Sequence, residues 1–157
     1  METPITGKVT LNLKPETLNS LIAKEHIETV LPHRNPFIFI DNLIDASTVE
    51  FKTDFIVQPD NIFIKNDVLQ EPALIENIAQ TCAAGFGFLN RQSNGNATLG
   101  FIGAVTKLEL FNLPVVNSMI TTKAYVTYQF QNVFLVKGEN YCNDKKLLEC
   151  EMKIVIT

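Results

Sequence analysis

The chain has 157 residues, of which 46% are hydrophobic and 19% charged, a composition typical of one folded domain and not of a disordered segment. A formal net charge of −4 with no basic stripe argues against nucleic-acid binding, and no apolar run reaches the roughly 20 residues that span a bilayer. The sequence holds two histidines and three cysteines without a CxxC pair, which argues against a metal site and against disulfides.

The N-terminal region lacks the apolar core of a secretory signal, so we expect a cytoplasmic protein that forms a single domain over residues 1–157. Residues 1–30 are interpreted as an N-terminal extension with a short amphipathic helix between Lys14 and Val30, which must stop near Pro32. His26 belongs to this segment and is predicted to be a surface residue. No GxGxxG or P-loop spacing occurs, so no nucleotide cofactor is expected.

Two extended stretches follow. Residues 37–44 are apolar and rich in strand-forming side chains. Residues 49–57 alternate strictly, and this predicts a strand whose inward face carries Val49, Phe51, Thr53, Phe55 and Val57.

A long helix is predicted over residues 71–90, in EPALIENIAQTCAAGFGFLN. Pro72 lies in its first turn, where proline is favoured, and the RQSNGN stretch ends it. The helix is apolar on most of its faces, which is typical of a helix buried on all sides. Its alanines and glycines allow neighbouring backbones to approach closely.

Period-two patterns return after the helix. They predict strands over residues 99–108, 120–130, 134–142 and 148–156, the last two joined as a hairpin by the NDKK turn. One long helix among five or six strands, with no alternating helices, indicates an α+β fold in which an antiparallel sheet curves around the helix.

Glu76 is a carboxylate near the start of this apolar helix, and two interpretations stay open. In the first interpretation, the helix dipole favours a carboxylate in the first turns, and the role of Glu76 is structural alone. Alternatively, burial raises its pKa and makes it a general acid, beside helix N–H groups that could polarise a carbonyl.

His33, in LPHRNPF, is either a loop histidine bonded to the backbone or a general base. Gln80 lies one turn beyond Glu76, where it could orient that carboxylate, cap a substrate amide or be a satisfied core group. Cys82 has no basic neighbour in the sequence and is predicted to be a core residue.

Three motifs carry a resemblance to a known family. LPHRNPFIFIDNLID resembles the opening of bacterial β-hydroxyacyl-acyl-carrier-protein dehydratases, ALIENIAQ their central-helix motif, and NLPVVNSMI the segment before their long strands. The three cover most of the chain after about Ile27, in the family's order. The resemblance implies a hotdog fold, a curved antiparallel sheet wrapped around one central helix and usually dimerised through sheet edges.

The resemblance also implies the chemistry. The substrate would be a 3-hydroxyacyl chain on the phosphopantetheine of an acyl carrier protein, with no other cofactor. Loss of water would give the trans-2-enoyl thioester, in fatty-acid or polyene-type lipid synthesis. In the family, the helix glutamate, here Glu76 by position, works with a histidine contributed across the dimer.

The chain departs from the family at that histidine, which lies in a Gly-His-Phe-Pro loop just before the helix. Counting back from Glu76 places Ile62 there, with Phe63 at the family's phenylalanine. No histidine occurs after His33, so the usual base is absent. The chain looks more like the divergent dehydratase-like hotdog proteins of aryl-polyene-type pigment pathways.

Three functions therefore remain open. The first is a dehydratase with His33 as base at the α-carbon and Glu76 as acid at the β-hydroxyl. The second is a binding or scaffold subunit that completes a heterodimer with an active dehydratase, and the third is a thioesterase in which Glu76 activates water. The residues predicted to contact substrate are Pro36, Phe37, Phe63, Pro72 and Gln80.

A curved sheet leaves an open edge, so we expect a homodimer or a heterodimer with a related subunit. The second expected partner is an acyl carrier protein, which is acidic and needs local basic residues for docking. The candidates flank the motifs and are Arg34, Lys65, Arg91 and Lys107.

Overall fold

The structure is a computed structural model and describes residues 19–93, 95 and 99–157. In chain order its elements are the 3₁₀ helix η1 (Lys24–Thr29), β1 (Asn42–Ala46), β2 (Glu50–Ile56), β3 (Ile64–Lys65), β4 (Val68–Leu69), the helix α1 (Glu71–Gln92), β5 (Gly100–Leu110), β6 (Met119–Phe130), β7 (Val133–Cys142) and β8 (Lys145–Ile156).

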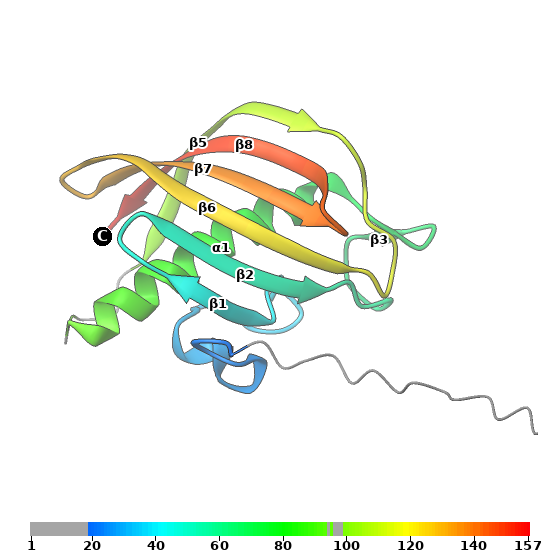
Figure 1. Cartoon of the computed structure of the whole chain (residues 1–157), viewed down its shortest axis with the longest axis horizontal. Coiled ribbons are helices and arrows are strands. Elements are labelled where there is room, and N and C mark those ends of the chain that lie inside the picture. The colour runs from blue at the N-terminus through cyan, green and yellow to red at the C-terminus, as the bar shows by residue number, and fades with distance from the viewer. Residues whose placement is uncertain (1–18, 94, 96–98) are drawn as a thin grey trace, which may run out of the picture.

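Six strands form one antiparallel sheet in the order β1-β2-β6-β7-β8-β5, and β3 and β4 form a separate small hairpin. Figure 1 shows the sheet curving over α1, with η1 (blue) lying beside β1 at the edge of the sheet. The predicted architecture, an antiparallel sheet around one central helix, is therefore confirmed.

Helix α1 is buried on two sides, as its apolar composition predicts. One hydrophobic cluster joins Leu74, Ile78 and Cys82 to the sheet, and a second joins Ala84 to Ile27 and neighbouring residues before β1. Small residues allow these contacts. A Cβ on Gly85 would lie 2.1 Å from the ring of Phe51, so glycine is what lets β2 approach the helix here.

The prediction for the N-terminal segment is wrong in part. Residues 14–18 lie outside the described residues, and the remainder forms only the 3₁₀ helix Lys24–Thr29 in place of an α-helix ending at Val30. Only Ile27 is buried within η1, and a short helix without a packed apolar face is not stable in water. His26 is exposed, as predicted.

The extended stretch before β2 also differs from its prediction. The strand starts at Asn42, so residues 37–41 lie outside any strand. Backbone groups of Phe39 bond instead to side chains of α1, which replaces the strand ladder in this stretch. Val49 is 61% exposed because it precedes the first residue of β2, so the predicted inward face of this strand begins at Phe51.

The later strands and the helix are where the sequence predicts them. The helix continues two residues beyond the predicted end, to Gln92. The β7–β8 hairpin turns at Asn143 and Asp144, which both have positive φ, as a two-residue hairpin loop requires. Within the described residues, every helix is too short or too polar to cross a lipid bilayer.

Candidate active site

A hollow of about 260 Å³ lies along α1, between the loop after η1 and the strands β5 and β8. Its walls are mostly apolar, and a carboxylate and an imidazole are the ionisable groups that face each other within it. The lining residues are Val30, Pro32, His33, Glu76, Ala79, Cys82, Ala83, Phe86, Gly87, Gly100, Phe101, Ile102, Ile154 and Ile156.

The two residues singled out from the sequence meet in this pocket. Nε2 of His33 lies 3.3 Å from Oε1 of Glu76, and the two side chains are 33% and 34% exposed. His33 comes from the loop between η1 and β1, and Glu76 from the second turn of α1. One chain therefore brings together a carboxylate and an imidazole beside an apolar cavity, the arrangement that acid–base chemistry needs.

The pKa of Glu76 is lowered, opposite to the direction expected from burial alone. The hydrogen bond from His33 is the largest cause of the lowered pKa. Burial raises the pKa but is outweighed, and a hydrogen bond from Gln80 lowers it further. The carboxylate is therefore ionised near neutral pH in the free chain. It is not, in this state, the protonated acid that the sequence interpretation required.

The surroundings of Nδ1, the other ring nitrogen of His33, indicate which nitrogen carries the ring hydrogen. In the described part of the chain, Nδ1 is buried and has no hydrogen-bond partner. A proton on Nδ1 would leave a buried donor unsatisfied, so of the two neutral tautomers the one with its hydrogen on Nε2 fits the free chain better. In that tautomer Nε2 of His33 donates its hydrogen to Oε1 of Glu76.

Gln80 orients the carboxylate and does not line the pocket. It is fully buried. Its Nε2 donates to Oε1 of Glu76 and to the carbonyl of Phe37, both at 2.8 Å, and its Oε1 accepts from the amide of Phe39 at 2.8 Å. Of the roles left open by the sequence, this geometry matches the orienting one.

The other residues predicted to contact substrate lie elsewhere. Pro36 lines a separate hollow with Lys24, and Phe37 is 57% exposed. The ring of Phe63 packs against the core, and Pro72 is exposed at the start of α1. The structure does not bring these four together with the Glu76–His33 pair, and their contact with substrate stays a prediction.

Ile62, at the position of the family histidine, is 48% exposed in the turn before β3 and does not line the pocket. One wall of the pocket is formed by Glu76, Ala79, Ala83 and Phe86 of α1. The sequence predicted these apolar helix residues only as core. The spacing i, i+3, i+7 and i+10 places these residues on one helix face, which is the signal that could have found them.

Cys82 also lines the pocket, and it is 1% exposed. Burial raises the pKa of its thiol far above the usual range, and the nearby Cys150 thiol adds to the shift. Cys82 is therefore a protonated core thiol at neutral pH and not a nucleophile, as predicted.

Three of the four predicted carrier-docking cations already have partners in the chain. Nε of Arg34 lies 3.1 Å from Glu28, and Arg91 donates to the carbonyl of Thr29 at 2.9 Å. The ammonium of Lys107 lies 2.9 Å from Glu151. The fourth, Lys65, is exposed at the end of β3, and the docking role of all four stays a prediction.

Within the described residues, no group of three or more histidines, cysteines and carboxylates is placed to hold a metal ion.

Comparison with known families places these features in context. The family model described as ApeP-like, ApeP dehydratase, matches residues 25–154. A 3-hydroxyacyl-[acyl-carrier-protein] dehydratase FabZ from Legionella pneumophila is 23% identical over 134 residues, which cover 82% of this chain and 89% of the relative. A bifunctional enzyme LpxC/FabZ from Chlorobaculum tepidum is 28% identical over 129 residues, 74% of this chain and 27% of the relative.

Solved structures share the fold. The dehydratase heterocomplex ApeI:P from Xenorhabdus doucetiae aligns with a TM-score of 0.77 and 18% identity, over 83% of this chain and 90% of that chain. Cj0977 from Campylobacter jejuni aligns with a TM-score of 0.64 and 12% identity, over 83% and 95%. The predicted hotdog fold is thereby confirmed.

Proposed function

The chain belongs to the ApeP-like dehydratase family, and on that premise we propose that it takes part in removing water from a 3-hydroxyacyl thioester. The acyl group is carried on the phosphopantetheine of an acyl carrier protein, and no other cofactor takes part. The observation that carries the proposal is the pair of Glu76 and His33 at 3.3 Å in a largely apolar pocket. FabZ relatives named for this reaction support the substrate class.

The elimination moves two protons. A base takes a proton from C2, the C3–oxygen bond breaks, and an acid gives a proton to the departing hydroxyl, so that water leaves and a C2–C3 double bond forms. The Glu76–His33 pair suits both steps when Glu76 is protonated and the ring hydrogen of His33 is on Nδ1, because Nε2 is then free to accept and the carboxyl is able to donate. This form holds one proton more than the pair of the free chain, and the pair takes that proton up from solvent.

Substrate binding supplies the reason for the pair to take up this proton. Burial already raises the pKa of Glu76 and is outweighed in the free chain by the bond from His33. An apolar acyl chain in the pocket excludes water and increases this desolvation. Desolvation favours the neutral pair, in which Glu76 is protonated and the His33 ring is neutral with its hydrogen on Nδ1, over a charged carboxylate.

We propose that a related hotdog subunit completes the site on the β5 side. β5 pairs with β8 along one edge and ends the six-stranded sheet. Three of its residues, Gly100, Phe101 and Ile102, line the pocket, and Phe101 is 55% exposed. An uncovered edge with exposed apolar side chains is typical of a sheet that pairs with another chain. The ApeI:P heterocomplex favours a heterodimer over a homodimer.

The experiment is a dehydration assay with 3-hydroxyacyl-carrier protein, run with the pure chain and with the chain plus a related hotdog subunit. We expect loss of one water from the acyl group when the assembly is complete, and loss of this turnover in Glu76→Gln. Absence of dehydration in every assembly contradicts the proposal. Release of free acid would instead support the thioesterase alternative.

The second candidate function is a partner subunit without chemistry of its own. The lowered pKa of Glu76 and the absence of any histidine after His33 favour it. A mixed complex separates the two functions. If a complex with Glu76→Gln and His33→Gln in this chain alone keeps full turnover, the chain is a scaffold; if turnover falls, this chain supplies the chemistry.

A further inference from the structure

A buried polar cluster lies beneath α1 and has no member in the pocket lining. Asn77, Thr122 and Asn140 are each at most 1% exposed. Thr122 on β6 and Asn140 on β7 are register partners, and both donate hydrogen bonds to Oδ1 of Asn77, the one from Asn140 at 2.9 Å. Buried polar groups destabilise an apolar interface unless they are bonded, so a connected cluster specifies one arrangement of the groups it joins.

The remaining polar group of Asn77 reaches the segment that follows His33. Its Nδ2 donates to the carbonyl of Phe39 at 2.6 Å. Three residues further along α1, Oε1 of Gln80 accepts from the amide of Phe39 at 2.8 Å. Both backbone groups of Phe39, a residue outside any strand, are therefore satisfied by helix side chains.

The position of residues 37–39 against α1 determines where His33 lies. Gln80 bonds the carbonyl of Phe37 as well as the carboxylate of Glu76, so the same helix face holds the segment and the acidic partner. Asn77 makes the one side-chain bond to the carbonyl of Phe39 that the described residues show. Misplacing a catalytic group by about 1 Å costs roughly 10²-fold in rate, so the position of this segment against α1 matters for the chemistry.

Resting on the proposed function, we propose that Asn77 is a positioning residue: by holding the carbonyl of Phe39 against α1, it keeps His33 within reach of Glu76. Asn77 touches neither the pocket nor the carboxylate. Thr122 and Asn140 act through it, because their donors point the carbonyl oxygen of its amide toward the sheet and leave the NH₂ group for Phe39.

The test compares Asn77→Ala with Thr122→Val in the full chain. Thr122→Val keeps the shape of a buried side chain in the same cluster, and Asn140 still donates to Oδ1 of Asn77, so the bond from Asn77 to Phe39 stays in place. The readout is the titration of the Glu76 carboxyl followed by ¹³C NMR. His33 and Cys82 are the other titratable groups that line the pocket, and burial keeps Cys82 protonated, so the titration reports the pairing with His33.

We expect the pKa of Glu76 to rise toward the ordinary glutamate value in Asn77→Ala and to stay low in Thr122→Val. In the assembled enzyme, kcat should fall by about 10²-fold in Asn77→Ala with little change in KM. An unchanged Glu76 titration in Asn77→Ala overturns the proposal. An equal rise in both variants also overturns it, because the cluster would then act only through general stability.

Asn77→Ser, which keeps a short donor, replaces the alanine variant if that variant does not fold, and we expect it to restore part of the low pKa. If neither folds, hydrogen exchange in the wild-type chain decides. The Phe39 amide and the Asn77 side-chain amide should be protected together, and rapid exchange of the Asn77 group in the folded protein overturns the proposal. The titration and hydrogen-exchange readouts need no turnover, so they stand apart from the outcome of the dehydration assay.

Discussion

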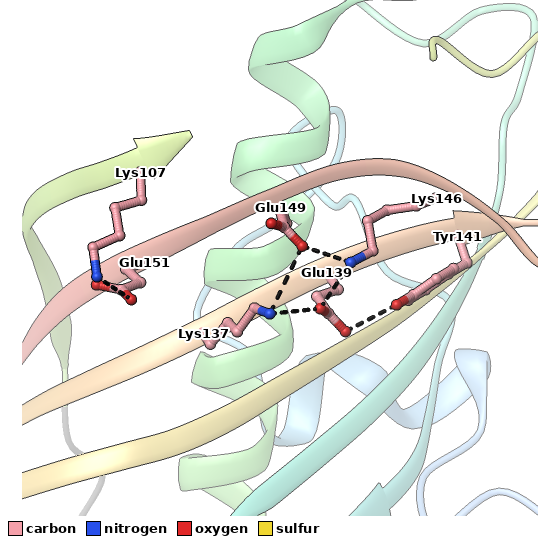
Figure 2. Close-up of polar contacts among 7 residues, drawn as sticks. All are labelled: Lys107, Lys137, Glu139, Tyr141, Lys146, Glu149 and Glu151. Atoms are coloured by element: carbon pink, nitrogen blue, oxygen red, sulfur yellow. Dashed lines mark hydrogen bonds and ion pairs between the residues drawn. The ribbon is translucent and has the colours of Figure 1, made fainter. Parts of the chain in front are cut away.

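Two carboxylates of the molecule, Glu76 on α1 and Glu139 on β7, both have a lowered pKa, but their partners differ in kind. Glu139 lies on the outer face of the sheet, where Lys137 and Lys146 approach it to 3.0 and 3.1 Å and Tyr141 donates to it at 2.9 Å (Figure 2). Burial alone raises the pKa of Glu139, but these three bonds outweigh it and lower the pKa to about 2.

The difference separates a carboxylate with a structural role from the one proposed to carry the chemistry. Lysines stay charged through the neutral range, so Glu139 has no neighbour that exchanges a proton with it at neutral pH. Glu76 has an imidazole as its partner, and the ring nitrogens of an imidazole can both accept and donate a proton. Glu76 also borders a cavity, whereas Glu139 is covered by its own partners.

The largest expected effect tests this contrast in activity. Glu76→Gln keeps the size of the side chain but removes the transferable proton, and dehydration by the assembled enzyme should fall by roughly 10²–10⁴-fold. Glu139→Gln makes the same chemical change on the outer face and should leave turnover unchanged. Steady-state assays of the two variants, with circular dichroism to confirm folding, make the comparison. Turnover that survives in Glu76→Gln would contradict the contrast between Glu76 and Glu139.

The second effect is on stability. The folded pKa of Glu139 is depressed, so the stability it contributes is present above its unfolded pKa of about 4.3 and is lost as pH falls through about 2. We expect Glu139→Gln to destabilise the fold by about 1–2 kcal/mol at pH 7, after allowing for solvent around the lysines.

The measurement is urea unfolding of the wild type and of Glu139→Gln at several pH values. The gap between the two free energies of unfolding should stay constant from pH 7 to about 5 and close below about pH 4. A gap that widens on acidification would contradict the assigned pairing.

The smallest effect concerns the neighbouring pair on the same face, Lys107 and Glu151, also drawn in Figure 2. Their side chains are 74% and 45% exposed, so solvent and salt screen the interaction. Lys107→Ala should change the free energy of unfolding by less than about 0.5 kcal/mol. A thermal melt showing a loss as large as that of Glu139→Gln would contradict the distinction between covered and exposed pairs.

Local signals explain which parts of the fold could be predicted. Pro72 begins the long helix and the RQSNGN stretch ends it, and both signals act within a few residues. Alternation predicts β6 and β8 because side chains on a strand with one buried face must alternate. The resemblance in the PHRNPF and ALIENIAQ motifs supplied the hotdog topology, which alternation alone does not specify.

Long-range contacts explain the rest. Residues 37–41 look like a strand, but the side chains that bond Phe39 come from the middle of α1. The direction of the Glu76 pKa shift depends on a histidine from another element, so burial alone predicted the wrong sign. Asn77 gave no sequence signal, because its role exists only once β6 and β7 pack beneath the helix.

The most direct test of the Glu76–His33 pair is to titrate both side chains in one NMR sample of the full chain and again in His33→Gln. Two groups that share a proton titrate together, so each pH step should be visible at both residues. In His33→Gln the pKa of Glu76 should rise, because the strongest bond that lowers it is lost while burial remains. A Glu76 titration that is the same in both proteins would show that the pair does not form in solution, and the proposed chemistry would lose its acid and base together.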